Sequence, residues 1–152
     1  MDLSLPALMA RALTTRRLVR APIWLYQHGL GWLLGSRLMM LEHVGRKSGH
    51  PRYVVLEVVE RPRSGVLLLV SGFGTRSQWY RNLQAEPRCF VSTGKLKRAP
   101  ASARLLSDEE SAAALARYAR TYPRAYAQLT AAIEKATGAP AGIMPMVELE
   151  LR

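Results

Sequence analysis

A short basic turn is the stretch of this sequence best equipped for chemistry. Residues 45–52 read Gly-Arg-Lys-Ser-Gly-His-Pro-Arg and combine three cations with a hydroxyl and two glycines. Glycines allow positive φ angles, so successive backbone N–H groups can face one anion, while arginine offers a two-pronged donor for phosphate or carboxylate. We therefore interpret Arg46, Lys47, Ser48 and Arg52 as an anion-binding set. The alternative is a solvated hairpin end whose charges keep a sheet edge soluble.

A glycine-containing loop further along the chain is a second candidate anion site. The apolar run 66–70 predicts a buried strand, and residues 71–77 then read Ser-Gly-Phe-Gly-Thr-Arg-Ser. We expect Ser77 to cap a helix from Gln78 to about Ala85, whose first N–H groups would be unpaired and partly positive. The loop has neither the ending of a Walker loop nor the Gly-x-Gly-x-x-Gly spacing of a dinucleotide fold. Alone it is a weak signal.

The turn and the loop have to be positioned by a sheet. Large apolar and β-branched residues flank the turn on both sides, which favours strands there. The same kind of pattern predicts strands at 37–44, 53–59, 66–70, 90–93, 99–106 and 146–151. Helices are expected at 78–85, 107–121 and 124–136, the second of them opened by a capping box of Ser107 and Glu110. The chain is thus expected to be an α+β protein of about six mostly antiparallel strands.

The N-terminal region predicts helix and an aromatic surface. Residues 1–20 have the pattern of a basic amphipathic helix that Pro22 breaks or restarts, and the apolar run 23–34 contains Trp24 and Trp32. That run is too short to span a membrane, and no small-x-small cleavage site of a signal peptide follows it. Two interpretations stay open: the region covers a ligand pocket, or its tryptophans lie at a membrane interface with arginines toward anionic lipid.

Composition narrows the class of partner. The 152 residues carry a net charge of +11, so a partner is expected to be negative: nucleic acid, an anionic membrane face or a polyanionic small molecule. Nucleic acid is the least favoured, because the cations are scattered and no recognition pattern accompanies them. The single cysteine, Cys89, excludes an internal disulfide, fits a buried hydrophobic role and suits a reducing cytoplasm.

The usual catalytic patterns are missing from the sequence. His28, His43 and His50 have no metal-ligand spacing with the cysteine or with paired acids, so no metal is expected and the histidines are interpreted as structural. Acids are few and there is no Gly-x-Ser-x-Gly elbow. What remains is two positively polarised loops, aromatic side chains and apolar strands. These features are typical of a protein that binds an anionic cofactor, where the cofactor itself supplies the reactive group.

Three motifs in series resemble the deazaflavin-dependent nitroreductase family, which includes deazaflavin-dependent quinone reductases. They are the basic turn at 45–52, Trp79-Tyr80-x-Asn82-Leu83 followed by Pro87, and Tyr122-Pro123 after the acidic-capped helix. The resemblance covers about residue 39 to the C-terminus. It implies a split β-barrel and coenzyme F-420, an 8-hydroxy-5-deazaflavin with a phosphate and a polyglutamate tail. Residues 37–152 would form this cofactor-binding domain as one globular unit, and residues 1–36 an N-terminal amphipathic helical segment.

The resemblance also implies roles for individual residues. Arg46, Lys47 and Arg52 would grip the phosphate and carboxylates of the tail. The loop 70–74 would lie along the deazaflavin ring by backbone contacts, and Trp79 would help to form the pocket. The set of cofactor-binding residues implied in this way is Arg46, Lys47, Ser48, Arg52, Val70, Ser71, Gly72, Phe73, Gly74 and Trp79. Tyr126, Ser71 or water would deliver a proton to the reduced acceptor.

The sequence departs from the family pattern at three places. It has Ser71-Gly72-Phe73-Gly74 where many members have a lysine-glycine-glycine type of loop, and Ser77 where many have proline shortly before the Trp-Tyr pair. Many members have several tyrosines around the Tyr-Pro motif, near the substrate, whereas only Tyr118, Tyr122 and Tyr126 are available here, with Tyr126 one position away from the usual one.

The resulting hypothesis is a cytoplasmic oxidoreductase, with peripheral contact to the inner face of the cell membrane as an option. It would transfer a hydride from the reduced deazaflavin to a lipophilic, electron-poor acceptor such as a quinone or nitroaromatic. The alternatives are a non-enzymatic basic module for nucleic acid or anionic lipid, and a split barrel for flavin mononucleotide or haem.

Overall fold

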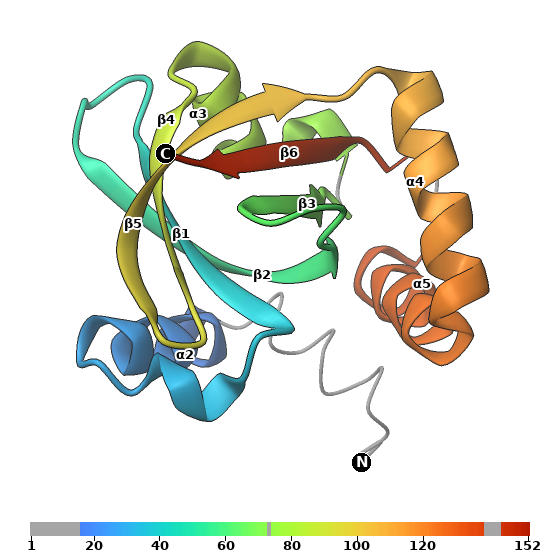
Figure 1. Cartoon of the computed structure of the whole chain (residues 1–152), viewed down its shortest axis with the longest axis horizontal. Coiled ribbons are helices and arrows are strands. Elements are labelled where there is room, and N and C mark those ends of the chain that lie inside the picture. Colours follow the sequence, from blue (N-terminus) through green and yellow to red (C-terminus); the bar gives the residue numbers. More distant parts are fainter. Residues whose placement is uncertain (1–15, 73, 139–143) are drawn as a thin grey trace.

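Six strands close into a barrel, and helices cover its sides (Figure 1). The computed structural model describes residues 16–72, 74–138 and 144–152, so most of the predicted N-terminal helix lies outside the described residues. The strands follow one another around the barrel in the order β1-β2-β3-β6-β5-β4. Their bounds are β1 Leu38–Val44, β2 Pro51–Glu60, β3 Val66–Val70, β4 Arg88–Thr93, β5 Leu96–Leu105 and β6 Met146–Leu151.

Every strand pairing recorded in the barrel is antiparallel. β1 pairs with β2 on one side and with β4 on the other, so closure of the barrel leaves β1 no free edge. In the β1–β2 hairpin Val44 pairs with Pro51 and His43 with Arg52, which places the basic turn directly beyond these residues. The six-stranded α+β split barrel expected from the sequence is confirmed.

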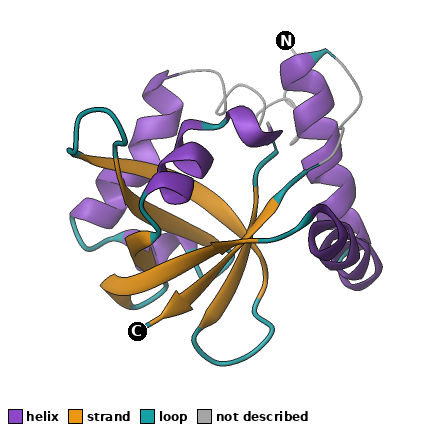
Figure 2. Cartoon of the chain, turned by 90° about the horizontal axis from the view of Figure 1, so that it is seen from above, coloured by secondary structure: helices purple, strands orange, loops and turns teal. Residues whose placement is uncertain are grey.

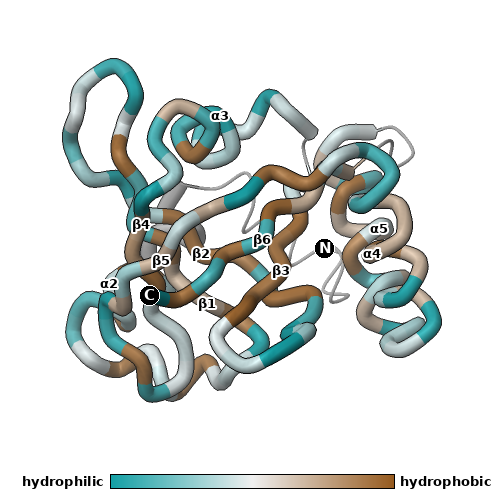
Figure 3. The backbone as a smooth tube through the Cα atoms, turned by 45° about the horizontal axis from the view of Figure 1, so that its top comes forward, coloured by the Kyte–Doolittle hydropathy of each residue, from teal (hydrophilic) through white to brown (hydrophobic). Residues whose placement is uncertain are grey.

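The barrel interior is the main hydrophobic core. All five residues of β3 are buried, as the continuous apolar run predicted, and Figure 3 shows this strand as hydrophobic along its length. Leu41, Leu69, Val91 and Leu149 have no exposed surface. Cys89 is also buried there, and burial raises the pKa of its thiol to about 12. Its predicted role as a small buried hydrophobe is therefore confirmed.

The helices lie around the outside of the strands (Figure 2). Helices α4 and α5 contact each other and share a second core cluster with β3 and β6 that includes Leu68, Tyr118, Ile133 and Met146. Helix α2 contacts β2, and α3 contacts β1 near the basic turn. The helix bounds are α2 Arg16–Gln27, α3 Gln78–Ala85, α4 Asp108–Thr121 and α5 Pro123–Thr137, with 3-10 turns η1 Gly31–Leu34 and η2 Gly74–Arg76.

Local sequence signals set most helix ends, with one exception. The predicted capping box at the start of α4 is present: Ser107 Oγ accepts from the backbone N–H of Glu110 at 3.1 Å, and the Glu110 carboxylate accepts from the backbone N–H of Ser107 at 3.1 Å. Gly138 ends α5 in the left-handed conformation. The break predicted at Pro22 is wrong, because α2 continues through Pro22 to Gln27. The helix packs against β2 and η1, and these tertiary contacts favour its continuation past the proline.

None of the helices in the described part of the chain is long and apolar enough to cross a membrane. This agrees with the prediction that the apolar run 23–34 does not span one. In the structure that run is split between the end of α2 and the short turn η1.

A substitution in β3 tests how much the barrel depends on its interior. Leu69→Ala removes a side chain with no exposed surface and is expected to lower the free energy of unfolding by about 2–5 kcal/mol. Leu33→Ala is the matched control, since Leu33 is 57% exposed and should change stability by less than about 0.5 kcal/mol. Urea denaturation measures both. Equal losses in the two variants would contradict this assignment of the core.

Candidate functional site

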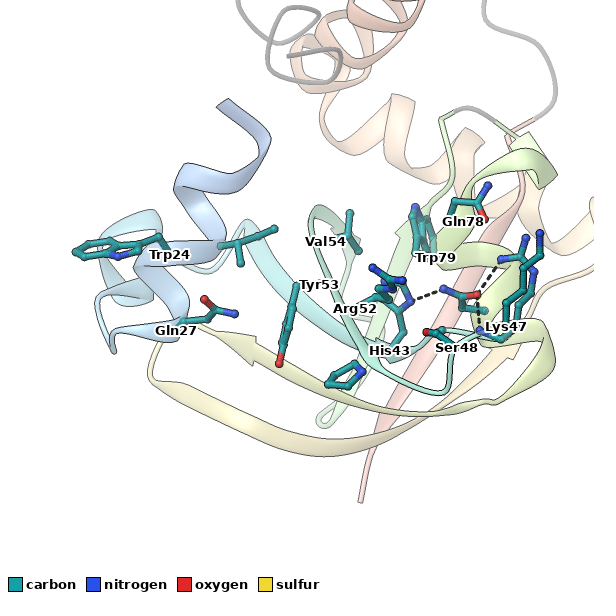
Figure 4. A pocket seen from close by; sticks show the side chains of 15 residues that line it. Trp24, Gln27, His43, Lys47, Ser48, Arg52, Tyr53, Val54, Gln78 and Trp79 are labelled. Atoms are coloured by element: carbon teal, nitrogen blue, oxygen red, sulfur yellow. Dashed lines mark hydrogen bonds between the residues drawn. The ribbon is translucent and has the colours of Figure 1, made fainter. Parts of the chain in front are cut away.

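A cavity of about 810 Å3 opens between α2, the β1–β2 turn and the first turns of α3. Figure 4 shows Trp24 and Gln27 of α2 on one side, with the basic turn and Trp79 of α3 opposite them. The lining includes three cations and no acidic residue. Its charged and aromatic members are Trp24, Arg46, Lys47, Arg52, Tyr53 and Trp79. The cavity is therefore suited to a ligand that combines an anionic part with a planar one.

Backbone hydrogen bonds hold the basic turn in a tight loop. The N–H of Gly45 donates to the carbonyl of His50 at 2.9 Å, and the N–H of Gly49 donates to the carbonyl of Gly45 at 2.7 Å. Gly49 has φ +75°, which favours glycine. A Cβ on Gly45 would lie 2.7 Å from Ser48 Oγ, so this glycine lets the turn close. Ser48 Oγ itself accepts from the N–H of His50 at 3.2 Å, which commits part of its hydrogen bonding to the turn.

The side-chain amide of Asn82 links α3 to the turn. Asn82 Oδ1 accepts from the backbone N–H of Arg46 at 3.1 Å and from Arg46 Nη1 at 2.9 Å. Asn82 is 4% exposed, so these bonds are shielded from water. The amide therefore fixes both the backbone and the guanidinium of Arg46. Lys47 and Arg52 line the same cavity and form no ion pair with any acid in the described chain.

His43 completes this network beneath the turn. Because Asn82 Oδ1 accepts from Arg46, the Asn82 NH2 group faces His43 Nδ1 at 3.0 Å, and Nδ1 must then be the acceptor. The hydrogen of the neutral imidazole is consequently on Nε2. Burial, with the nearby Arg52 charge as a smaller cause, lowers the pKa of His43 from 6.5 to about 4. His43 is neutral at physiological pH, and its predicted structural role is supported by these contacts.

The glycine loop is packed more tightly than the sequence suggested. Ser71 has no exposed surface, and its Oγ donates to the carbonyl of Gly74 at 2.6 Å and lies 2.9 Å from Ser77 Oγ. Ser77 does precede α3, but its side chain makes no capping hydrogen bond, so that prediction is wrong. The physical reason is that the Ser77 hydroxyl is bonded to Ser71 instead.

The loop does not contribute to the lining of the 810 Å3 cavity. Val70 and Ser71 are buried, and a Cβ on Gly72 would lie 3.0 Å from Ile133 Cδ1 of α5. Gly74 is half-buried. Phe73 lies outside the described residues. The structure thus brings together Arg46, Lys47, Ser48, Arg52 and Trp79 of the predicted set around one cavity, and the described loop residues, 70–72 and 74, do not line that cavity.

Tyr126, the other predicted proton donor, lies on α5 and does not line the cavity either. It is half-buried and packs edge-on against Tyr118, with ring centroids 6.3 Å apart. The hydroxyl of Tyr118 donates to Glu57 Oε1 at 2.6 Å, and burial together with this hydrogen bond raises its pKa. The roles of Tyr126 and Ser71 in proton delivery stay predictions.

Sequence reasoning missed Asn82 as a member of the site. The signal was present, because Asn82 follows Trp79 by three residues and therefore shares its helix face. The contact with residue 46 could not be derived, since it joins elements far apart in the sequence. The described residues contain no group of three or more potential metal ligands, and no metal site was predicted.

The fold is that of a split-barrel protein, and its 810 Å3 cavity combines three cations with aromatic side chains. A family model described as F420H(2)-dependent quinone reductase matches residues 18–137. The chain belongs to this family. It is therefore a deazaflavin-dependent oxidoreductase whose cofactor is coenzyme F-420, and it passes hydride to an electron-poor acceptor of the quinone type. The resemblance seen in the sequence is confirmed.

Solved structures support the same fold. An F420-H2 dependent reductase (FDR-A) is 28% identical, with a TM-score of 0.51 over 75% of this chain and 94% of its own. A structure described as a domain-swapped dimer is 26% identical, with a TM-score of 0.55 over 76% of this chain and 81% of its own. A pyridoxamine 5'-phosphate oxidase-related FMN-binding protein from Nostoc punctiforme is 17% identical, with a TM-score of 0.52 over 87% of this chain and 79% of its own. At this identity the similarity is evidence for the fold alone. No curated protein matches the chain.

The donor set of the cavity fits coenzyme F-420. The coenzyme has a phosphate and several carboxylates, and the cavity offers three cationic side chains without a competing acid. It also has a planar ring, which aromatic walls such as Tyr53 and Trp79 suit. When bound in its reduced form, the coenzyme supplies the hydride.

The buried His43 predicts a loss of stability in acid. Its folded-state pKa of about 4 lies below the ordinary 6.5, so as pH falls between these values the unfolded chain binds a proton that the folded chain does not. The free energy of unfolding should fall by about 3 kcal/mol from this group. His43→Gln retains an acceptor for Asn82 and does not titrate, so this part of the pH dependence should disappear.

Urea denaturation between pH 4 and pH 7 measures the effect. His28→Gln is the matched control, because His28 is exposed in the turn just after α2 and its substitution should leave the wild-type pH dependence unchanged. The same slope in His43→Gln as in the wild type would show that His43 is not the responsible group.

Proposed function

We propose that the 810 Å3 cavity is the coenzyme F-420 site and that Arg46, Lys47 and Arg52 hold the phosphate and carboxylates of the tail. The observation that carries this proposal is the acid-free cationic lining, in which the Asn82 amide fixes Arg46 from behind. A guanidinium that is already oriented loses less conformational entropy when it binds an anion. Lys47 and Arg52 add charge that no acid of the described chain neutralises. The turn thus serves as a preformed anchor for the tail.

The deazaflavin ring would extend from this anchor past Trp79 toward the glycine loop. Trp79 is 7% exposed, lines the cavity beside the turn and follows the loop closely in sequence, which supports this direction for the ring. Because Val70 and Ser71 are buried, contact with the ring would come through the half-buried backbone at Gly72 and Gly74. Side-chain-free backbone permits the close approach that a planar ring needs.

The protein's contribution to the reaction would be positioning and exclusion of water. No acidic side chain faces the cavity, and its only histidine is neutral and bonded to Asn82. Such a site holds donor and acceptor in contact and needs no covalent step. For the proton that the reduced acceptor requires, Tyr126 is favoured over Ser71. The Ser71 hydroxyl donates inside its own loop, whereas the Tyr126 hydroxyl has no hydrogen-bond partner in the described chain.

A lipophilic quinone would reach the site from a membrane surface. Trp24 is 52% exposed at the edge of the cavity, and Trp32, Leu33 and Leu96 are exposed by 58%, 57% and 43%. The turn η1 contacts β4, and Lys97 reaches Gly29, so the β4–β5 hairpin lies beside α2 and η1 (Figure 1). Exposed tryptophans next to lysines are typical of peripheral binding to anionic lipid. We infer peripheral contact with a cytoplasmic leaflet through this face.

Titration with oxidised coenzyme F-420 tests the cofactor site. Lys47→Ala and Arg52→Gln should each weaken binding about tenfold or more, because each removes a charged donor to the tail, and neither should change the fold. Lys95→Ala is the matched control, since Lys95 is exposed in the β4–β5 turn and does not line the cavity. Fluorescence of the coenzyme gives the affinity. Unchanged binding in both cavity variants would remove the turn from the site, and DNA titration would then test the nucleic-acid alternative.

Vesicle sedimentation tests the membrane proposal. Trp32→Ala should lower partitioning to phosphatidylserine-containing vesicles about tenfold, because it removes the largest exposed apolar side chain of the face. Tyr122→Ala is the control, since Tyr122 is an exposed aromatic residue on the α4–α5 side. The wild type should bind neutral vesicles more weakly than anionic ones. Equal partitioning of the three proteins would contradict the proposed face.

A further inference from the structure

A second cavity, of about 550 Å3, lies at the other end of β1 from the basic turn. It is enclosed by the chain just before β1, the end of β2 and the last turns of α4. Buried Val59, which packs in the same core cluster as Tyr118, forms an apolar floor, and Tyr118 and Tyr122 form one wall. Val58 also lines the cavity, although it packs in the cluster inside the barrel. Four arginines surround this floor: Arg37, Arg61, Arg117 and Arg120. Volume and lining fall in the range of sites for small organic ligands.

Hydrogen bonds to the barrel hold three of these arginines in place. Arg37 Nη2 donates to Glu57 Oε1 at 3.0 Å, and Arg117 Nε donates to Glu60 Oε2 at 3.2 Å. Arg61 Nη2 donates to the carbonyl of Ser36 and lies 3.4 Å from Thr93 Oγ1. Only Arg120 is without such a contact among the described residues. The rim is therefore largely preorganised, which lowers the entropic cost of binding an anion.

Positively charged side chains outnumber negatively charged ones at this cavity. Four guanidinium groups face two carboxylates, those of Glu57 and Glu60, which leaves an excess of two positive charges. The excess belongs to Arg61 and Arg120, since Arg37 and Arg117 are the ion-paired members. Tyr122 is 54% exposed beside them, with its ring 5.9 Å from that of Tyr118. Two uncompensated guanidiniums next to an exposed aromatic ring match a planar molecule with two negative charges.

The second cavity shares no lining residue with the 810 Å3 cavity. His43 on β1 lines the 810 Å3 cavity, and Arg37, just before β1, lines the second cavity. The two residues are six positions apart, and six residues of extended chain span roughly 20 Å. On β2 the two linings are also separate, at 51–54 and 58–60. A ligand held by Arg61 and Arg120 is thus distinct from the anion anchored by the basic turn.

We propose that this second cavity binds an aromatic dianion, either an aryl phosphate or an aromatic dicarboxylate. Arg61 and Arg120 hold the anionic groups, Tyr122 stacks on the ring, and the valine floor excludes water from its far face. The Tyr118–Glu57–Arg37 network is a support, because it fixes one wall and neutralises the guanidinium of Arg37.

Isothermal titration calorimetry on the full chain with phenyl phosphate and with isophthalate tests the proposal. Arg120→Gln should weaken binding about tenfold, since it removes one charge-assisted contact. The substitution leaves the fold intact because this side chain is exposed and unpaired. Arg124→Gln is the matched control with the same change of charge outside the cavity. Lys47→Ala should leave this binding unchanged, which separates the site from the basic turn.

Comparing the ligands in this titration distinguishes an aryl phosphate site from a dicarboxylate site. Binding of phenyl phosphate alone identifies an aryl phosphate site, and binding of isophthalate alone identifies a dicarboxylate site. Inorganic phosphate should bind more weakly than phenyl phosphate, because it gains nothing from the aromatic wall. The proposal is overturned if neither aromatic dianion binds, if Arg120→Gln binds as tightly as the wild type, or if inorganic phosphate equals phenyl phosphate.

Discussion

The amide of Asn82 is the contact on which the proposed coenzyme site depends. Its oxygen holds both the backbone and the guanidinium of Arg46, and its nitrogen faces the acceptor atom of His43. Because the group is buried, none of these bonds can be replaced by water without opening the packing. One side chain on α3 thereby determines where the basic turn sits and how one of its cations points. An anion site on an exposed hairpin end becomes rigid through a single interior amide.

Barrel closure makes that contact available. Strand β1 is bonded on both sides, so the hairpin it forms with β2 cannot slip in register without breaking the pairing to β4 as well. The pairing of His43 with Arg52 places the neutral imidazole beneath the turn and the cation beside the cavity. Helix α3 contacts β1 from outside and brings Trp79 and Asn82 to the same place. The site therefore consists of residues on a hairpin and a helix that the barrel holds together.

Much of this arrangement could be predicted from sequence because its signals are local. The strands, the capping box at Ser107 and the end of α5 at Gly138 follow from patterns within a few residues. The errors arose where tertiary contacts override local preference. Helix α2 continues through Pro22, and the Ser77 hydroxyl bonds to Ser71 rather than capping α3. The Asn82 contact to Arg46 spans 36 residues, so no local pattern could reveal it.

The pairing of charges explains why net charge alone could not identify the partner. Six glutamates form ion pairs with arginines, among them Glu42 with Arg98 and Glu148 with Arg104. These exposed pairs contribute little stability individually, yet they neutralise arginines that would otherwise make the whole surface basic. Positive charge without an acidic partner then remains at specific places, including Lys47 and Arg52 beside the turn. A uniformly basic surface would suit a long polyanion such as nucleic acid, whereas a cluster of cations in one cavity suits a small anionic molecule. Cations such as Lys95 and Arg124, which lie outside both cavities, also lack an acidic partner in the described chain, so the grouping of cations around the basic turn, and not the net charge, favours a small ligand.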